Sequence, residues 1–311
     1  MNITEVKQTL RGPMIPVITN YHDDLSVNYD AIRENVRYVV DRGIVRGSGV
    51  LLAAGAGGDF PMLTLDERKQ VAKAIVDAAD GKVPVVVGAQ DTNVRVMIEM
   101  ARWAEEIGAY SVQFGPGYYY QSSADDCLRL FEAVHEATSS VAIMIYNTHW
   151  ENHNMSLDEV SRLAELPRCV ALKWSTDQGL GETMRGIARF ADRLAVIDNA
   201  GLHVMNHLLG GTGYITHLCT VWPEHDLEVW RLLEAGDYVA AQKQITAANW
   251  PWSSFRGKMW NRTGAESPVV NAALELRGRP GGPSRLPTRS LTDEERTELR
   301  EVLVHIGVPG L

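Results

Sequence analysis

Eight short apolar runs recur along the first two thirds of this 311-residue chain, and amphipathic patterns of helical period lie between them. The runs cover residues 14–18, 49–54, 84–88, 110–114, 141–146, 169–173, 194–198 and 213–217. They are continuously apolar, as in the strands of a parallel sheet that is covered on both faces. Because eight βα units are the number that closes a barrel, we predict an α/β fold, a (β/α)8 TIM barrel; a doubly wound open sheet uses the same units.

The glycine spacing argues against the open sheet as a nucleotide-binding fold. Such folds carry GxGxxG between their first strand and first helix. Residues 47–49 and 55–58 are rich in glycine but lack this spacing, and the second stretch also lacks the lysine of a P-loop. We therefore expect no nucleotide cofactor.

The strand pattern stops after residue 217, and helical patterns continue to the end of the chain. This change predicts a barrel with the active site in residues 1–225 and a C-terminal helical region in residues 226–311.

The charge and cysteine content narrow the possible partners. A net charge of −9 disfavours nucleic acid and anionic membranes as partners, because both require clustered lysine and arginine. Three cysteines, far apart and odd in number, form neither a disulfide framework nor a CxxC metal site. No apolar run is long enough to span a bilayer, and the first residues do not resemble a signal peptide. We expect a cytoplasmic protein that binds a small molecule.

Lys173 is the most informative single residue, because it ends the apolar run of residues 169–173. Burial penalises the ammonium form, and a neutral amine can attack a carbonyl to form an imine. The alternative is a strand-end lysine whose flexible stem reaches solvent. In a parallel barrel the active site lies at the carboxyl ends of the strands, where Tyr146 of the neighbouring strand supplies a possible proton carrier. The other strand-end candidates are Thr19, residues 56–59, Tyr118, Asp198 and Thr216 or His217.

Several of these strand ends resemble the dihydrodipicolinate synthase and N-acetylneuraminate lyase family of class I aldolases. The matching stretches are residues 12–19, the turn of residues 55–59 in place of the family's GTTGE, Tyr146-Asn147, residues 170–173 and residues 209–215. The motifs occur in the family's order over nearly the whole barrel, and the helical tail is similar too.

The resemblance implies catalytic roles for three residues. Lys173 matches the lysine that forms an imine with a 2-oxo acid, most often pyruvate, and Tyr146 matches the proton-carrying tyrosine. Tyr118 resembles the tyrosine that one subunit of a family tetramer inserts into its neighbour; Tyr119 is an alternative register, and a packing role for these aromatic residues is the other possibility. The resemblance implies no metal or other cofactor. It implies assembly as a homotetramer, a dimer of dimers.

The chain departs from the family where substrate is bound. Ala56 and Gly57 replace two threonines that bind the oxo acid's carboxylate and relay protons, although the backbone N–H groups of this turn can still form an anion-binding nest. Glu151 stands near the place of an arginine that grips the second substrate's carboxylate. With Asp198, it predicts a basic or polyhydroxylated partner and disfavours an anionic semialdehyde. The alternative is that Glu151 is a solvated loop carboxylate. The expected substrate-binding residues are Ala56, Gly57, Gly58, Asp59, Asn147, Glu151, Asp198 and Ile215.

Three other residues suggest different chemistry: His149, His153 and Lys258. His149 and His153 have chelating spacing, but they lie in an expected loop without the HExxH order, so we expect no metal there. Lys258 is a second candidate amine, but it lies in the helical tail and is expected at the surface or an interface.

These observations predict a class I aldolase-type lyase that cleaves or forms a C–C bond of a 2-oxo acid, with pyruvate as one product. Two alternatives remain open. The Gly58-Asp59-Phe60 turn resembles that of 5-dehydro-4-deoxyglucarate dehydratases, which favours a Schiff-base hydro-lyase. The Ala56-Gly57 replacement favours a ligand-binding barrel that has lost catalysis.

Overall fold

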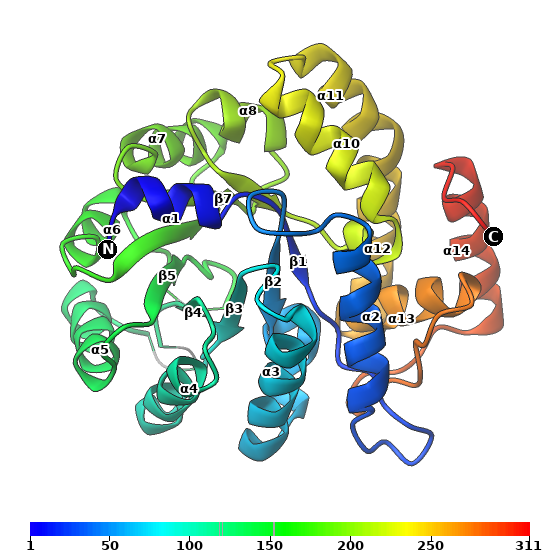
Figure 1. Cartoon of the computed structure of the whole chain (residues 1–311), viewed down its shortest axis with the longest axis horizontal. Helices are drawn as coiled ribbons and strands as arrows, with labels where there is room; N and C mark the ends of the chain where they lie inside the picture. Colours follow the sequence, from blue (N-terminus) through cyan, green and yellow to red (C-terminus); the bar gives the residue numbers. More distant parts are fainter. Residues whose placement is uncertain (118, 120, 152) are drawn as a thin grey trace. The chain divides into compact units, whose positions relative to one another are not determined.

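The computed structural model describes residues 1–117, 119, 121–151 and 153–311. In this part of the chain eight parallel strands form a closed barrel in the order β1 to β8, so the predicted TIM barrel is confirmed (Figure 1). The strands are β1 (Gly12–Pro16), β2 (Val50–Ala53), β3 (Val85–Gly88), β4 (Ser111–Phe114), β5 (Ala142–Tyr146), β6 (Cys169–Trp174), β7 (Ala195–Asp198) and β8 (Gly213–Ile215). The eighth strand is shorter than expected, because Thr216 and His217 turn the chain into the short helix α9.

The α-helices follow the amphipathic patterns. They are α1 (Ile3–Thr9), α2 (Tyr29–Asp41), α3 (Leu65–Ala79), α4 (Val94–Glu106), α5 (Ala124–Ala137), α6 (Leu157–Leu163), α7 (Leu180–Phe190), α8 (His203–Leu208), α9 (Leu218–Val221), α10 (Pro223–Glu234), α11 (Tyr238–Gln244), α12 (Trp250–Thr263), α13 (Ser267–Leu276) and α14 (Asp293–His305). Capping boxes at Thr64, Ser123, Ser156 and Thr292 fix where α3, α5, α6 and α14 begin. None of the described helices combines the length and apolarity that crossing a bilayer requires.

The chain divides into two compact units. Unit 1 comprises Met1–Met14, Val45–Leu52 and Val83–Ile215, and unit 2 comprises Ile15–Ile44, Ala53–Lys82 and Thr216–Leu311. The boundary expected at residue 225 stays a prediction.

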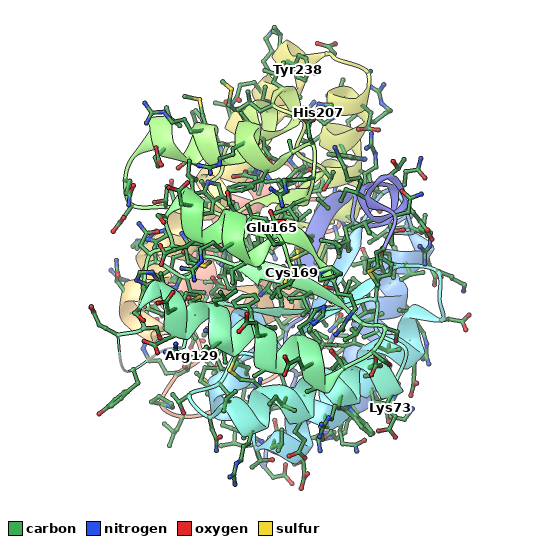
Figure 2. The ribbon with its side chains drawn as sticks, turned by 90° about the vertical axis from the view of Figure 1, so that its left-hand side faces the viewer. Lys73, Arg129, Glu165, Cys169, His207 and Tyr238 are labelled. Carbon is green, nitrogen blue, oxygen red and sulfur yellow. The ribbon has the colours of Figure 1, made fainter. Side chains whose placement is uncertain are left out.

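Unit 1 has a hydrophobic core formed by α1 and the barrel strands. Helix α1 packs against β6 and β7 (Figure 1), and Figure 2 views this unit with Cys169 at the start of β6 and Arg129 and Glu165 in the region of α5 and α6. Its buried cluster contains Val6, Leu10, Met14, Val50, Leu52, Val86, Ala142, Met144, Val170, Ala171, Ala195 and Ile197. Because side chains alternate along a strand, Tyr146 continues the row of Met144, and Lys173 continues the row of Ala171.

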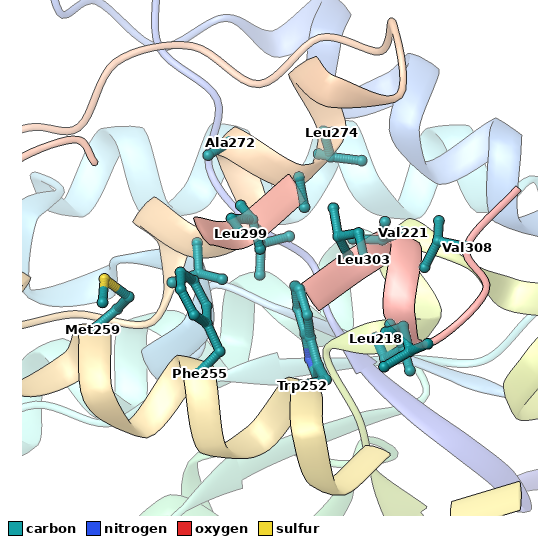
Figure 3. Packing of buried hydrophobic residues seen from close by; sticks show 14 of the residues in the cluster. Leu218, Val221, Trp252, Phe255, Met259, Ala272, Leu274, Leu299, Leu303 and Val308 are labelled. Atoms are coloured by element: carbon teal, nitrogen blue, oxygen red, sulfur yellow. The ribbon is translucent and has the colours of Figure 1, made fainter. Parts of the chain in front are cut away.

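Unit 2 has a core of its own, built mainly by the C-terminal helices. In Figure 3, Trp252, Phe255 and Met259 of α12 pack with Leu299 and Leu303 of α14. Leu218 and Val221 of α9, with Ala272 and Leu274 of α13, belong to the same cluster. The helical tail predicted from the sequence is therefore present.

Candidate active site

Lys173 and Tyr146 lie together at the carboxyl ends of β6 and β5. The two residues are register partners, and the Nζ atom of Lys173 lies 4.1 Å from the centroid of the Tyr146 ring. Lys173 is 5% exposed and Tyr146 is 8% exposed, so neither side chain extends into bulk solvent. The alternative interpretation of Lys173, a strand-end lysine whose side chain reaches solvent, is therefore wrong.

The neighbouring tryptophan fixes the direction of Lys173. Trp174 is buried and its indole N–H donates a 3.1 Å hydrogen bond to the carbonyl oxygen of Thr183, on α7. Gly186 of α7 leaves room for this ring, because a Cβ there would lie 2.4 Å from Trp174 Nε1. With Trp174 held against α7, alternation along the strand directs Lys173 to the opposite face, toward the barrel interior.

Asn147 ties the loop after β5 to the end of β6. Its side-chain N–H groups donate to Asn154 Oδ1 and to the carbonyl oxygen of Ser175, both at 2.7 Å. Its Oδ1 accepts from the N–H of Met155 at 3.0 Å, and the residue is fully buried. The side-chain amide of Asn147 is thus hydrogen-bonded to Asn154, Met155 and Ser175. This geometry does not support its predicted role in substrate binding.

The loop that Asn147 holds carries an aromatic side chain that sequence reasoning missed. Trp150 is 49% exposed, and its ring meets the Tyr146 ring at 66° with centroids 5.8 Å apart. The ring of His149 meets Trp150 at 84° and 4.8 Å. Glu151 is exposed beside them, and its N–H closes a turn onto the carbonyl oxygen of Thr148. The one sequence feature that could have indicated Trp150 is its position four residues after Tyr146, the predicted proton carrier.

Asp198 does not lie where it was expected. It is completely buried, its Oδ2 lies 2.7 Å from Nδ1 of His203, and its Oδ1 accepts from the N–H of Ala200. The His203 ring in turn stacks on Tyr214 at 4.0 Å. Ile197, the register partner of Lys173, belongs to the core cluster, so Asp198 faces the other side of β7. The expectation of a second negative charge at the mouth is therefore wrong.

The remaining candidates in unit 1 are Ile215, the two histidines and the tyrosines of residues 118 and 119. Ile215 is the last residue of β8 and the register partner of Met14, so its role in substrate binding stays a prediction. His153 lies 2.6 Å from Glu159, and within the described residues no three His, Cys, Asp or Glu side chains gather to hold a metal. Tyr118 lies outside the residues that the structure describes; Tyr119, the alternative register, is exposed.

In unit 2 the turn after β2 is tightly packed. Ala56–Gly58 form a single 3-10 turn, in which the N–H of Gly58 bonds to Gly55 and that of Asp59 to Ala56. The hydroxyl of Thr19 donates to the carbonyl oxygen of Gly58 at 2.7 Å. The N–H groups of Gly58 and Asp59 are thus used within the turn, and an anion nest formed by the N–H groups of Ala56 and Gly57 stays a prediction.

Gly57 makes room for a hydrogen-bonded His217–Glu266 pair that sequence reasoning also missed. A Cβ at Gly57 would lie 2.8 Å from Pro16 Cβ, 2.9 Å from His217 Nε2 and 3.0 Å from Glu266 Oε2. His217 and Glu266 lie 2.7 Å apart, and Arg256 is 3.6 Å from the other carboxylate oxygen. No short-range pattern reveals this pair, because its members are 49 residues apart in sequence.

Asp59 lies buried next to that turn in a left-handed conformation, with φ of 58°. Its Oδ1 accepts from the hydroxyl of Ser267 at 2.7 Å, while Oδ2 has no hydrogen-bond partner among the described residues. Burial raises the pKa of the Asp59 carboxyl to about 7; the Ser267 hydrogen bond opposes this rise and Glu266 adds to it. At neutral pH this carboxyl therefore retains its proton far more than an ordinary aspartate does.

This pKa predicts a pH-dependent stability. The folded protein keeps the Asp59 proton up to a pKa of about 7, whereas the unfolded chain releases it near pH 4. The free energy of unfolding therefore falls as pH rises from about 4 to 7, because ionisation then favours the unfolded chain. Asp59→Asn keeps the acceptor for Ser267 and removes the ionisation. We expect urea unfolding to show the variant gaining about 3 kcal/mol over the parent between these pH values. An equal pH dependence in both proteins would contradict the assignment.

Comparisons with known proteins agree with this architecture. The family model described as the dihydrodipicolinate synthetase family matches residues 9–306. A 4-hydroxy-tetrahydrodipicolinate synthase of Methanothrix thermoacetophila is 30% identical over 96% of this chain and 97% of its own length. The 4-hydroxy-tetrahydrodipicolinate synthase 1 of Halalkalibacterium halodurans is 29% identical over 91% and 92%. The crystal structure of a chloride-inhibited dihydrodipicolinate synthase from Acinetobacter baumannii, complexed with pyruvate, has a TM-score of 0.84 at 24% identity and covers 96% of this chain and 100% of that one; at this identity it supports the fold alone.

Proposed function

The chain belongs to the dihydrodipicolinate synthetase family, whose members are aldolase-type lyases that use a lysine Schiff base and no metal. From that premise we propose that it cleaves a C–C bond of a 2-oxo acid in the retro-aldol direction, with pyruvate as one product. Lys173 is the amine that forms the imine, and Tyr146 is the acid and base.

The observation that carries the proposal is the contact between this amine and this phenol. Nζ of Lys173 lies 4.1 Å from the Tyr146 ring centroid, and both side chains are buried at strand ends. Imine chemistry requires a nucleophile and a proton carrier held within reach of one carbon atom. The two residues supply those groups from neighbouring, rigid strands, which favours a single geometry.

The proposed reaction proceeds through an imine and an enamine. The neutral amine attacks the ketone carbon, C2, and the carbonyl oxygen leaves as water after proton transfer. When a base takes the proton of the C4 hydroxyl, the C3–C4 bond breaks, its electron pair moves toward the protonated imine, and an aldehyde departs. Protonation of the enamine at C3 and hydrolysis release pyruvate and regenerate the amine. Tyr146 carries the protons of these steps.

The released aldehyde is not an anionic semialdehyde. The segments that follow β5 and β6, residues 147–155 and 175–179, contain no lysine or arginine, whereas they contain Glu151 and Asp177. An anionic partner would meet like charge and no compensating cation there. This composition favours cleavage of an uncharged or cationic partner over condensation with a second carboxylated substrate.

Trapping with borohydride tests the proposal. The protein is incubated with pyruvate, reduced, digested and analysed by mass spectrometry. We expect a reduced pyruvyl group on Lys173 and on no other lysine. Absence of any adduct would favour the non-catalytic binding barrel, and an adduct elsewhere would overturn the assignment of Lys173.

Glu151→Arg tests the charge argument. The variant should trap pyruvate as the parent does, because Glu151 lies on the loop and not at the amine. We expect its preference to shift about two- to fivefold toward aldehydes that carry a carboxylate, the scale of an exposed ion pair. Competition between succinic semialdehyde and butanal measures this preference; an unchanged ratio would remove Glu151 from the partner site.

The family's members form oligomers and bind pyruvate-type substrates. Assembly of this chain as a homotetramer, a dimer of dimers, and its location in the cytoplasm are proposals that rest on this family membership.

A further inference from the structure

Trp150 adjoins the proposed catalytic pair without belonging to it. The Tyr146 ring is a neighbour of both Lys173 and Trp150, with Nζ of the lysine 4.1 Å from its centroid and the indole centroid 5.8 Å from it. The two rings meet at 66°, so they form an aromatic corner. With 49% of Trp150 exposed, the corner retains aromatic surface that another ring can cover.

The corner is held in place by hydrogen bonds at both ends of its loop. Asn147 bonds to Asn154 and to the end of β6, and Asn154 donates to Thr176 Oγ1 at 3.0 Å and to Asp177 Oδ1 at 2.6 Å. These contacts restrict the loop before any ligand binds, so little conformational entropy is lost when its tip is covered.

The same hydrogen bonds determine what the loop can recognise. The amide groups of Asn147 and Asn154 are engaged with the protein, so they do not serve a polyhydroxylated ligand. Burial lowers the pKa of His149, which favours its neutral form at pH 7. What the tip offers beside Tyr146 is therefore mainly aromatic surface, with no cation for a carboxylate.

We propose that Trp150 is a specificity-determining residue, and that the aldehyde released by this enzyme carries an aromatic ring that packs in the corner formed by Trp150 and Tyr146. The substrate class is then a 4-aryl-4-hydroxy-2-oxobutanoate, which a retro-aldol step divides into pyruvate and an aryl aldehyde. This inference rests on the proposed function and replaces the polyhydroxylated or basic partner expected from the sequence. A ring covering the indole adds packing that a saturated ring of equal size makes less well.

Aldehyde selectivity in the condensation direction tests the inference. Pyruvate is combined with benzaldehyde, cyclohexanecarbaldehyde, 4-carboxybenzaldehyde or glyceraldehyde, and kcat/KM is measured by product chromatography. We expect benzaldehyde to exceed cyclohexanecarbaldehyde about tenfold and to exceed the other two aldehydes as well. Trp150→Ala should abolish the preference for benzaldehyde over cyclohexanecarbaldehyde, and Trp150→Phe should keep most of it.

Trp250→Ala is the matched control, because Trp250 is a comparably exposed tryptophan, 54%, on α12 of unit 2. It should leave every ratio unchanged. Pyruvate trapping on Lys173 is measured in each variant and separates the two hypotheses. If trapping is normal but glyceraldehyde or the carboxylated aldehyde is preferred, or if Trp150→Ala leaves the ratios unaltered, the inference is overturned and the proposed function stands. If the parent traps no pyruvate, the proposed function fails and the inference fails with it.

Discussion

Lys173→Met is expected to abolish imine formation and to lower turnover by about 10⁴-fold or more, the scale on which removal of a covalent nucleophile acts. Methionine resembles the lysine stem in length and lacks the amine. Because residue 173 is buried, an apolar side chain should be accommodated without loss of stability. The measurement is borohydride trapping with pyruvate, followed by peptide mapping, alongside thermal unfolding to verify the fold.

Lys258 provides the control for this experiment. Its Nζ bonds to both carboxylate oxygens of Glu298, and its side chain is 41% exposed. An amine engaged by both oxygens of a carboxylate is not positioned to attack the carbonyl carbon of a substrate. Lys258→Ala should therefore trap pyruvate as the parent does. Persistent trapping in a folded Lys173→Met protein would assign the chemistry to another amine.

The position of Lys173 could be predicted because it depends on local periodicity and on topology. Continuously apolar runs indicated parallel strands, eight of them indicated closure, and parallel strands carry their functional residues at their carboxyl ends. Tyr146 follows from the same reasoning on the neighbouring strand. Neither prediction depends on the conformation of a loop.

Asp198 shows where this reasoning fails. The sequence places it at the end of a run just as it places Lys173, but the register pairs Lys173 with Ile197. A displacement of one residue along a strand reverses the face to which a side chain points. Register depends on hydrogen bonds between strands, so the apolar run by itself could not reveal it.

Trp150 and the His217–Glu266 pair could not be predicted for a different reason. The loop that carries Trp150 is shaped by Asn147 and Asn154, whose partners lie on the segment after the next strand. The His217–Glu266 pair joins the residue before α9 to the residue before α13. Both depend on side-chain contacts across distant parts of the sequence, which composition and period do not encode.

Tyr146→Phe is expected to lower kcat by about 10²- to 10³-fold, the range of a lost acid or base, while leaving KM nearly unchanged. The phenylalanine ring preserves the contacts with Lys173 and Trp150, so only the hydroxyl is removed. Pyruvate trapping should become slower but reach the parent's final stoichiometry, because Lys173 is still present. Single-turnover kinetics with mass-spectrometric detection of the adduct separates this slower approach from a lower endpoint.

Tyr110→Phe removes a hydroxyl from the same unit but from the amino end of β4, where the side chain bonds to Thr9. Residues at that end of a barrel contribute to stability and not to catalysis, so this variant should keep the parent's kcat. If instead Tyr146→Phe retained full kcat, the protons would have to move through another group. If it lost trapping altogether, the phenol would be needed to hold the amine, and the roles of the two residues would have to be reassigned.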